Sequence, residues 1–238
     1  MVRVRRWRVL FLSLGATALL MSTAIGAAAS APATTSSVLR AARAAISRQT
    51  GVRVVESLAG GSFSLHLILD LGRKSAEETL WVAGARARFR LTRTWAWGRG
   101  NLFAREFLFG LTATQAQKVG NHWVSARAGT SGYVRVKSYF SIPSPVGYLP
   151  PANGTTLSTT VADGVHVYVL AWTTAATKSM PKASNTMTFS AAGATLPVEL
   201  IETTSRGTVT TKYSRWGEHV AVRAPPVAST ISYSEATS

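Results

Sequence analysis

Apolar and polar residues alternate with a period of two along several stretches of the chain, which is the period of a half-buried β-strand. The clearest run covers residues 85–92. Its apolar positions are Ala85, Ala87, Phe89 and Leu91, and its polar positions are Arg86, Arg88, Arg90 and Thr92. The same alternation groups Phe63, Leu65, Leu67 and Leu69 in a second stretch and Val165, Val167 and Val169 in a third. We therefore expect strands that each bury one face.

The period changes to that of a helix near the N-terminus. Within residues 38–46, the residues Val38, Leu39, Ala42, Ala45 and Ile46 fall on one face at a spacing of 3.6. Ser36 or Ser37 is a suitable N-cap, and Gly51 is a suitable end. Shorter helices are predicted over 102–109 and 111–119, whereas residues 133–140 fit either a strand or a helix.

Turn residues separate the remaining strand-like stretches. Asp163-Gly164 stands between residues 155–161 and 165–172, and this dipeptide is typical of a tight hairpin. Further strands are predicted over 187–190, 198–204 and 208–213. Short strands with a turn every 8–12 residues favour a curved antiparallel sheet or a barrel, in an α+β chain.

The first thirty residues have the pattern of a secretory signal peptide. Four arginines within residues 3–8 precede an apolar run over 9–21, and small residues follow through Ser30. We predict cleavage after Ala29, so that residues 1–29 are removed, residues 30–36 form a linker and the protein is exported to the cell envelope or beyond. The alternative is an uncleaved anchor, because residues 9–29 approach the roughly 20 residues that span a bilayer.

Charge and cysteine content narrow the function. The chain has 26 Lys and Arg, 10 Asp and Glu, a net charge of +16 and no cysteine. Without residues 1–29 the excess is 22 basic over 10 acidic side chains, or +12. The missing cysteine excludes disulfides, thiolate metal sites and lipid attachment at a lipobox cysteine. The positive charge favours an anionic partner.

The arginine row Arg86, Arg88 and Arg90 is the best candidate for an anionic surface contact. An anionic membrane surface or a wall polymer fits it better than nucleic acid, which an exported protein is not expected to meet. The competing interpretation is a solvated outer face of an amphipathic strand.

Catalytic and metal-binding patterns are missing from the sequence. The four histidines and two aspartates show no ligand spacing, and there is no nucleophile elbow, phosphate loop or His-Glu-x-x-His motif. We expect no enzyme activity and no cofactor, and an enzyme is only the third hypothesis.

Several short motifs resemble a known family. They are Asp70-Leu71-Gly72, Gly98-Arg99-Gly100-Asn101, Phe109-Gly110-Leu111-Thr112, Gly120-x-x-Trp123-Val124 and Tyr213-Ser214-Arg215-Trp216-Gly217-Glu218. Together they resemble actinobacterial envelope proteins related to the LppX/LprG lipoproteins and, more remotely, the LolA carriers. The resemblance covers a domain over residues 37–226, and we expect a flexible tail over 227–238.

The resemblance implies a half-barrel of antiparallel strands around helices, with an apolar cavity for a lipid or another hydrophobic ligand, and no cofactor. The residues that would line this cavity are Leu65, Leu67, Leu69, Phe89, Leu91, Trp95, Trp97, Val165, Val167 and Val169. The same residues could instead form an ordinary core. The alternative function is an interaction or regulatory module of this fold that senses an envelope component without carrying it.

Overall fold

The structure is a computed structural model that describes residues 33–60, 64–140, 147, 149–178 and 181–238. The predicted signal peptide and Phe63 lie outside the described residues. Residues 33–238 form one compact unit.

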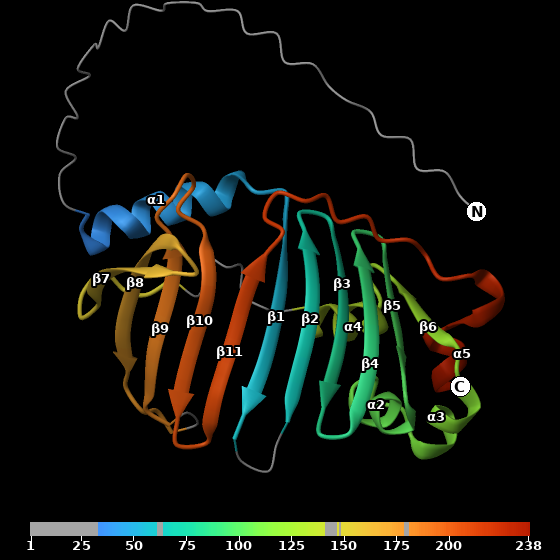
Figure 1. The fold of residues 1–238 in the computed structure, drawn as a ribbon. Helices are drawn as coiled ribbons and strands as arrows, with labels where there is room; N and C mark the ends of the chain where they lie inside the picture. The colour runs from blue at the N-terminus through green and yellow to red at the C-terminus, as the bar shows by residue number, and fades with distance from the viewer. Residues whose placement is uncertain (1–32, 61–63, 141–146, 148, 179–180) are drawn as a thin grey trace, which may run out of the picture. The chain divides into compact units, whose positions relative to one another are not determined.

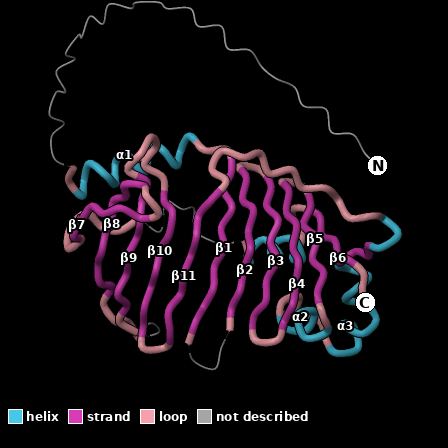
Figure 2. Tube along the Cα trace, viewed as in Figure 1, coloured by secondary structure: helices cyan, strands magenta, loops and turns pink. Residues whose placement is uncertain are grey.

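Twelve strands form one open sheet in the order β12-β6-β5-β4-β3-β2-β1-β11-β10-β9-β8-β7 (Figures 1 and 2). The strands are β1 (Gly51–Ala59), β2 (Leu65–Gly72), β3 (Ser75–Val82), β4 (Ala85–Thr92), β5 (Trp95–Gly100), β6 (Trp123–Arg127), β7 (Thr156–Ala162), β8 (Val165–Thr174), β9 (Ala183–Ser190), β10 (Pro197–Thr204), β11 (Gly207–Ser214) and β12 (Thr230–Ser232). Neighbouring strands are antiparallel except β12 and β6, which are parallel. The predicted α+β fold on a large antiparallel sheet that does not close is confirmed, with this one parallel pair added.

Five α-helices accompany the sheet among the described residues. They are α1 (Thr35–Arg48), α2 (Leu102–Phe107), α3 (Ala113–Val119), α4 (Ser131–Tyr139) and α5 (Tyr233–Thr237), and a 3-10 helix η2 covers Val227–Ser229. The five apolar positions predicted for the first helix are its buried residues. Its N-cap is Thr34, whose hydroxyl accepts from the Ser37 amide, so the helix begins slightly before the predicted caps.

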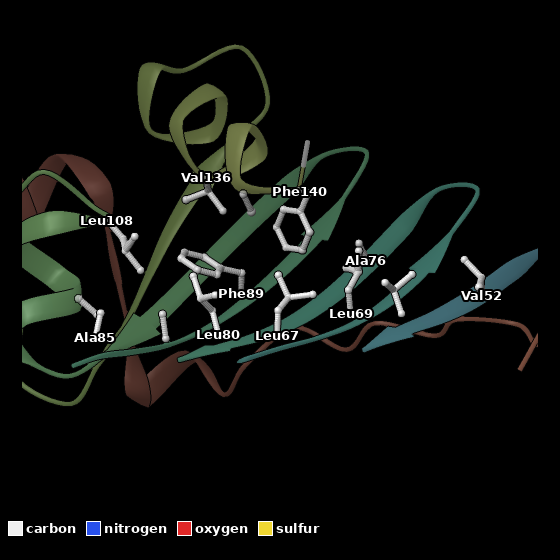
Figure 3. Packing of buried hydrophobic residues seen from close by; sticks show 14 of the residues in the cluster. Val52, Leu67, Leu69, Ala76, Leu80, Ala85, Phe89, Leu108, Val136 and Phe140 are labelled. Atoms are coloured by element: carbon white, nitrogen blue, oxygen red, sulfur yellow. The ribbon is translucent and has the colours of Figure 1, made fainter. Parts of the chain in front are cut away.

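Helix α4 resolves the ambiguity of residues 133–140. The Thr130 hydroxyl accepts from the Tyr133 amide and thereby caps the helix at its start. Its Val136 and Phe140 face the strands and belong to the buried core, and the ring of Phe140 packs against that of Phe89 (Figure 3). We call this face of the sheet the inner face and the opposite one the outer face.

The core lies on the inner face. Residues opposite each other on neighbouring strands share a face, so Val54, Leu69, Glu78 and Phe89 form one row across β1 to β4. Phe89 is fully buried and makes edge-to-face contacts with Phe109 and Phe140, at ring-centroid distances of 5.5 and 6.1 Å.

The Asp163-Gly164 hairpin is confirmed. Asp163 and Gly164 have φ of 49° and 77°, as a type I′ turn requires, and Ala162 lies opposite Val165.

The C-terminal residues are more ordered than the sequence predicts. Residues 227–238, expected to fray, form η2, β12 and α5, with β12 hydrogen-bonded to β6. Ser232 and Glu235 form a capping box on α5, and Ala236 is fully buried. The fraying predicted from the Ser/Thr/Ala-rich composition is therefore wrong. Pairing with β6 and the capping box order the segment, and composition does not reveal either of them.

Candidate functional site

A groove of about 560 Å³ opens between helix α4 and two neighbouring turns of the sheet. The β2–β3 turn and the β4–β5 turn bring their strand ends to it, and α4 forms the opposite wall. Its lining residues are Leu71, Gly72, Arg73, Lys74, Ser75, Ala76, Leu91, Thr92, Arg93, Tyr133, Val134, Lys137, Ser138 and Phe140. Its volume falls in the range of small-molecule sites.

The floor of the groove is apolar because the strand register places apolar residues side by side. Leu71 lies opposite Ala76, and Ala76 lies opposite Leu91. Phe140 closes the floor from the end of α4 and is buried, as Figure 3 shows. Val134 adds an apolar side chain on the wall and remains 63% exposed. Such a surface suits hydrocarbon better than a polar ligand.

The wall is fixed to the β4–β5 turn and to the end of α2 by specific hydrogen bonds. The Tyr133 hydroxyl donates to the carbonyl oxygens of Thr92 at 2.9 Å and Arg93 at 3.3 Å. The Arg135 guanidinium donates through Nε to the Leu108 carbonyl oxygen at 3.0 Å. The width of the groove is therefore set by bonded elements and does not depend on apolar packing alone.

The rim of the groove is cationic. It carries Arg73, Lys74, Arg93 and Lys137, and no carboxylate is among the lining residues. Arg73 donates to the carbonyl oxygens of Ser47 and Gln49 at the end of α1, where a cation is favoured. Within the described part of the chain, the other three side chains make no ion pair. They are therefore available to an anionic group.

The hydroxyl groups of the groove are already used within the protein. Ser75 donates to the Val220 carbonyl oxygen at 2.6 Å, and Ser138 donates to that of Arg135 at 2.6 Å. Thr92 donates to the Trp95 carbonyl oxygen at 3.1 Å. No histidine or acid lines the groove, so its residues offer an apolar floor and positive charge and no paired acid and base.

One carboxyl group lies deep on the inner face outside this groove. Glu78 is 1% exposed between Leu69 and Phe89, and its Oε2 has no hydrogen-bond partner among the described residues. Burial raises the pKa of Glu78 to about 8, and the negative charge of Glu56 contributes further. Glu78 is therefore protonated at neutral pH for the most part.

Comparison with known proteins finds a likeness in structure only. The lipoprotein LppX of Mycobacterium tuberculosis is similar over 79% of this chain and 98% of its own, with 15% identity and a TM-score of 0.49. LprF of Mycobacterium bovis is similar over 80% of this chain and 96% of its own, with 13% identity and a TM-score of 0.47. No protein-family model and no curated protein matches the chain. Both are mycobacterial lipoproteins of the LppX type that the motifs indicated, and the likeness carries no information on a ligand.

The predicted lining residues do not share one surface. Of the ten, only Leu91 belongs to the groove beside α4. Leu67, Leu69 and Phe89 are buried on the inner face as predicted for their strands, and Leu65 is half-buried there. Phe89 packs on Phe109 and Phe140, and all four side chains belong to the buried core cluster or pack against it.

Val165, Val167 and Val169 lie on the outer face. Leu170 of the same strand is opposite Met187, which is opposite Leu200, and all three belong to the inner core. The odd-numbered residues of β8 therefore point the other way. Val165 is exposed, and with Val167 it lines a separate outer groove of about 430 Å³.

The two tryptophans also lie on the outer face. Ala96, between them, is in the inner core, so Trp95 and Trp97 point outward and stack on each other at 6.3 Å. Trp95 is 41% exposed, and Trp97 is buried. They share this face with the arginine row and do not reach the inner face.

The arginine row is largely engaged within the protein. Arg88 and Arg90 both form ion pairs with Glu77. Arg90 also donates to the Arg223 carbonyl oxygen at 3.1 Å and lies 5.0 Å above the ring of Trp123, a cation–π distance. Arg86 is exposed without an ion pair among the described residues. Two of the three predicted anion contacts thus have partners already.

The basic rim is the feature that sequence reasoning missed. Its signal is present in the sequence, since Arg73-Lys74 and Arg93 stand in the turns that follow the apolar residues Leu71 and Leu91. Lys137 joins them only through the fold, because α4 is distant in sequence from both turns.

The described residues contain no helix long and apolar enough to cross a membrane. They also contain no group of three or more His, Cys, Asp or Glu residues that could hold a metal ion.

Proposed function

We propose that the protein is exported to the cell envelope and binds a lipid or another anionic amphiphile in the groove beside α4. The observation that carries this proposal is the combination of an apolar floor with a cationic rim that lacks acidic partners. The hydrocarbon part of the ligand lies on Leu71, Leu91 and Phe140. Its anionic head lies near Lys74, Arg93 and Lys137.

Both halves of this arrangement contribute to affinity. Each buried methylene group contributes about 0.8 kcal/mol, so a few methylenes suffice for measurable binding without specific contacts. Each basic side chain contributes about 1 kcal/mol close to an anionic lipid surface. The groove opens to solvent, which allows a ligand to enter and leave as a carrier requires. A sensor of an envelope component would bind through the same groove without transferring its ligand.

The test reverses the charge of the rim. We expect the double variant Lys74→Glu and Lys137→Glu to weaken binding of phosphatidylglycerol roughly tenfold or more, since about 1 kcal/mol per cation is lost and repulsion is added. Lys178→Glu and Lys182→Glu, exposed in the β8–β9 loop, form the matched control with the same change in net charge. Binding is measured by titration with labelled phosphatidylglycerol below its aggregation concentration.

A second arm tests the apolar floor. Val134→Asn replaces an exposed apolar side chain of the wall by a neutral polar one at little cost to folding, and we expect it to weaken binding of phosphatidylglycerol and phosphatidylcholine alike. Equal binding by the rim variant and its control would contradict the proposal. Transfer of labelled lipid between two vesicle populations separates a carrier, which accelerates transfer, from a sensor, which binds without doing so.

A further inference from the structure

In the part of the chain that the structure describes, strand β7 is an edge of the sheet without the usual protection. Six of its seven residues are exposed, and Leu157 is half-buried. Its sequence, Thr-Leu-Ser-Thr-Thr-Val-Ala, contains no charge, proline or glycine. Natural edge strands are normally kept from pairing by charges, proline, bulges or short length. The opposite edge follows this rule, since β12 has three residues and continues directly into α5.

The turn that follows β7 determines which backbone groups point away from the sheet. In a hairpin closed by a two-residue turn, the flanking residues form a hydrogen-bonded pair, and such pairs alternate along the ladder. Ala162 and Val165 flank the Asp163-Gly164 turn, so Thr160, Ser158 and Thr156 also bond toward β8. The amide and carbonyl groups of Leu157, Thr159 and Val161 therefore point outward.

The outward amide and carbonyl groups of β7 match those of β7 in a second copy of the protein, donor to acceptor. We propose that two copies of the protein associate through antiparallel β7 strands, with Thr159 on the twofold axis. In this register Thr159 pairs with Thr159 of the second copy, and Leu157 pairs with its Val161. All outward amide and carbonyl groups are then satisfied, by about six hydrogen bonds across the seam.

The side chains agree with the same register. Leu157 faces Val161 of the second copy on the inner face, which covers a valine that is 55% exposed in the single copy. On the outer face Ser158 meets Thr160, and Thr156 meets Ala162, so small residues oppose small residues. No charged residue of β7 is placed opposite a like charge.

This pairing closes at two copies. The interface is isologous and uses the longer of the two sheet edges, because the β12 edge is short and followed by a helix. A discrete dimer is therefore expected, and growth into a longer series of copies is not. The proposal is independent of the groove and of its ligand.

Sedimentation over a wide range of concentration tests the proposal. We expect a monomer–dimer equilibrium for the purified protein. Thr159→Lys and Thr159→Glu each place two like charges opposite each other on the twofold axis, and each should raise the dimer dissociation constant at least about tenfold. An equal mixture of the two variants should restore dimerisation, because the introduced ammonium group of one variant then meets the introduced carboxylate of the other.

The matched control is Thr173→Lys, which adds the same charge at an exposed position of β8 beyond the end of β7. It should leave the dissociation constant within about twofold of the original protein. Thr159 is exposed, so the variants should fold, and circular dichroism verifies this. A chain that stays monomeric at all concentrations, a dimer that Thr159→Lys does not weaken, or a mixture that fails to recover would each overturn the proposal.

Discussion

Among single residues, Glu78 has the environment that is least usual for its type. Its carboxyl group is buried between Leu69 and Phe89, and the loss of water raises its pKa to about 8 from an ordinary value of 4.5. Below pH 4.5 the group is protonated in both the folded and the unfolded chain. Between these two values the unfolded chain releases the proton and the folded chain keeps it. Stability is therefore lost as the pH rises through this window.

Replacing Glu78 should remove this pH dependence. We expect the free energy of unfolding of the protein to fall between about pH 5 and 9 by an amount on the order of 4 kcal/mol because of Glu78. That of Glu78→Gln should fall much less, since only Glu56, whose pKa is also raised by burial, then contributes in the same direction. Urea unfolding of both proteins across this range measures the difference. Glu218→Gln, at an exposed carboxylate, is the control and should follow the original protein. A parallel decline in Glu78→Gln would show that other groups cause the effect.

Among the elements, the C-terminal segment joins parts of the fold that are distant in sequence. Figure 1 shows residues 215–229 running along one end of strands β1 to β5 before β12 joins β6. Gln115 donates to the Thr237 carbonyl oxygen at 2.6 Å, and Ser125 donates to that of Ile231 at 3.1 Å. The segment thus covers the edge of β6 and holds α3 and α5 together.

Removal of residues 227–238 should lower the melting temperature by roughly 5–10 °C, since a few kcal/mol of packing and hydrogen bonding are lost. Gly132→Ala tests the same docking without truncation, because its Cβ would stand 2.6 Å from the Tyr233 ring. Val227→Ser, at a residue that is 90% exposed, is the control. Calorimetry measures all three. An unchanged melting temperature for the truncated chain would mean that the segment contributes little.

The elements also show where sequence patterns are sufficient. Residues 38–46 and 85–92 contain one apolar face each, and the structure buries those faces. Residues 165–172 are apolar at both the odd and the even positions. Valines stand at odd positions, and Tyr168, Leu170 and Trp172 stand at even positions. Period alone cannot orient such a strand, and the larger side chains took the inner face. The groove was not predictable either, because its rim unites two turns and α4 from distant parts of the sequence.

For the whole molecule, the net positive charge acts on both proposals. Salt should therefore have opposite effects on ligand binding in the groove and on dimerisation. The chain carries a net charge of +16, or +12 without residues 1–29. This charge attracts an anionic amphiphile and repels a second copy of the protein. The contacts at the β7 seam contain no charge of their own, so salt acts on the dimer only through the repulsion between copies.

Raising the salt concentration from about 0.1 M to about 1 M shortens the Debye length from about 10 Å to about 3 Å. We expect phosphatidylglycerol binding to weaken several-fold over this range, because the attraction of the rim is screened. Dimerisation should strengthen, because the repulsion between copies is screened as well. Titration and sedimentation in the same buffers measure both, with phosphatidylcholine as the neutral ligand whose binding should change little. If both associations weakened together, ion pairs would have to hold the dimer, and the uncharged β7 seam would be the wrong interface.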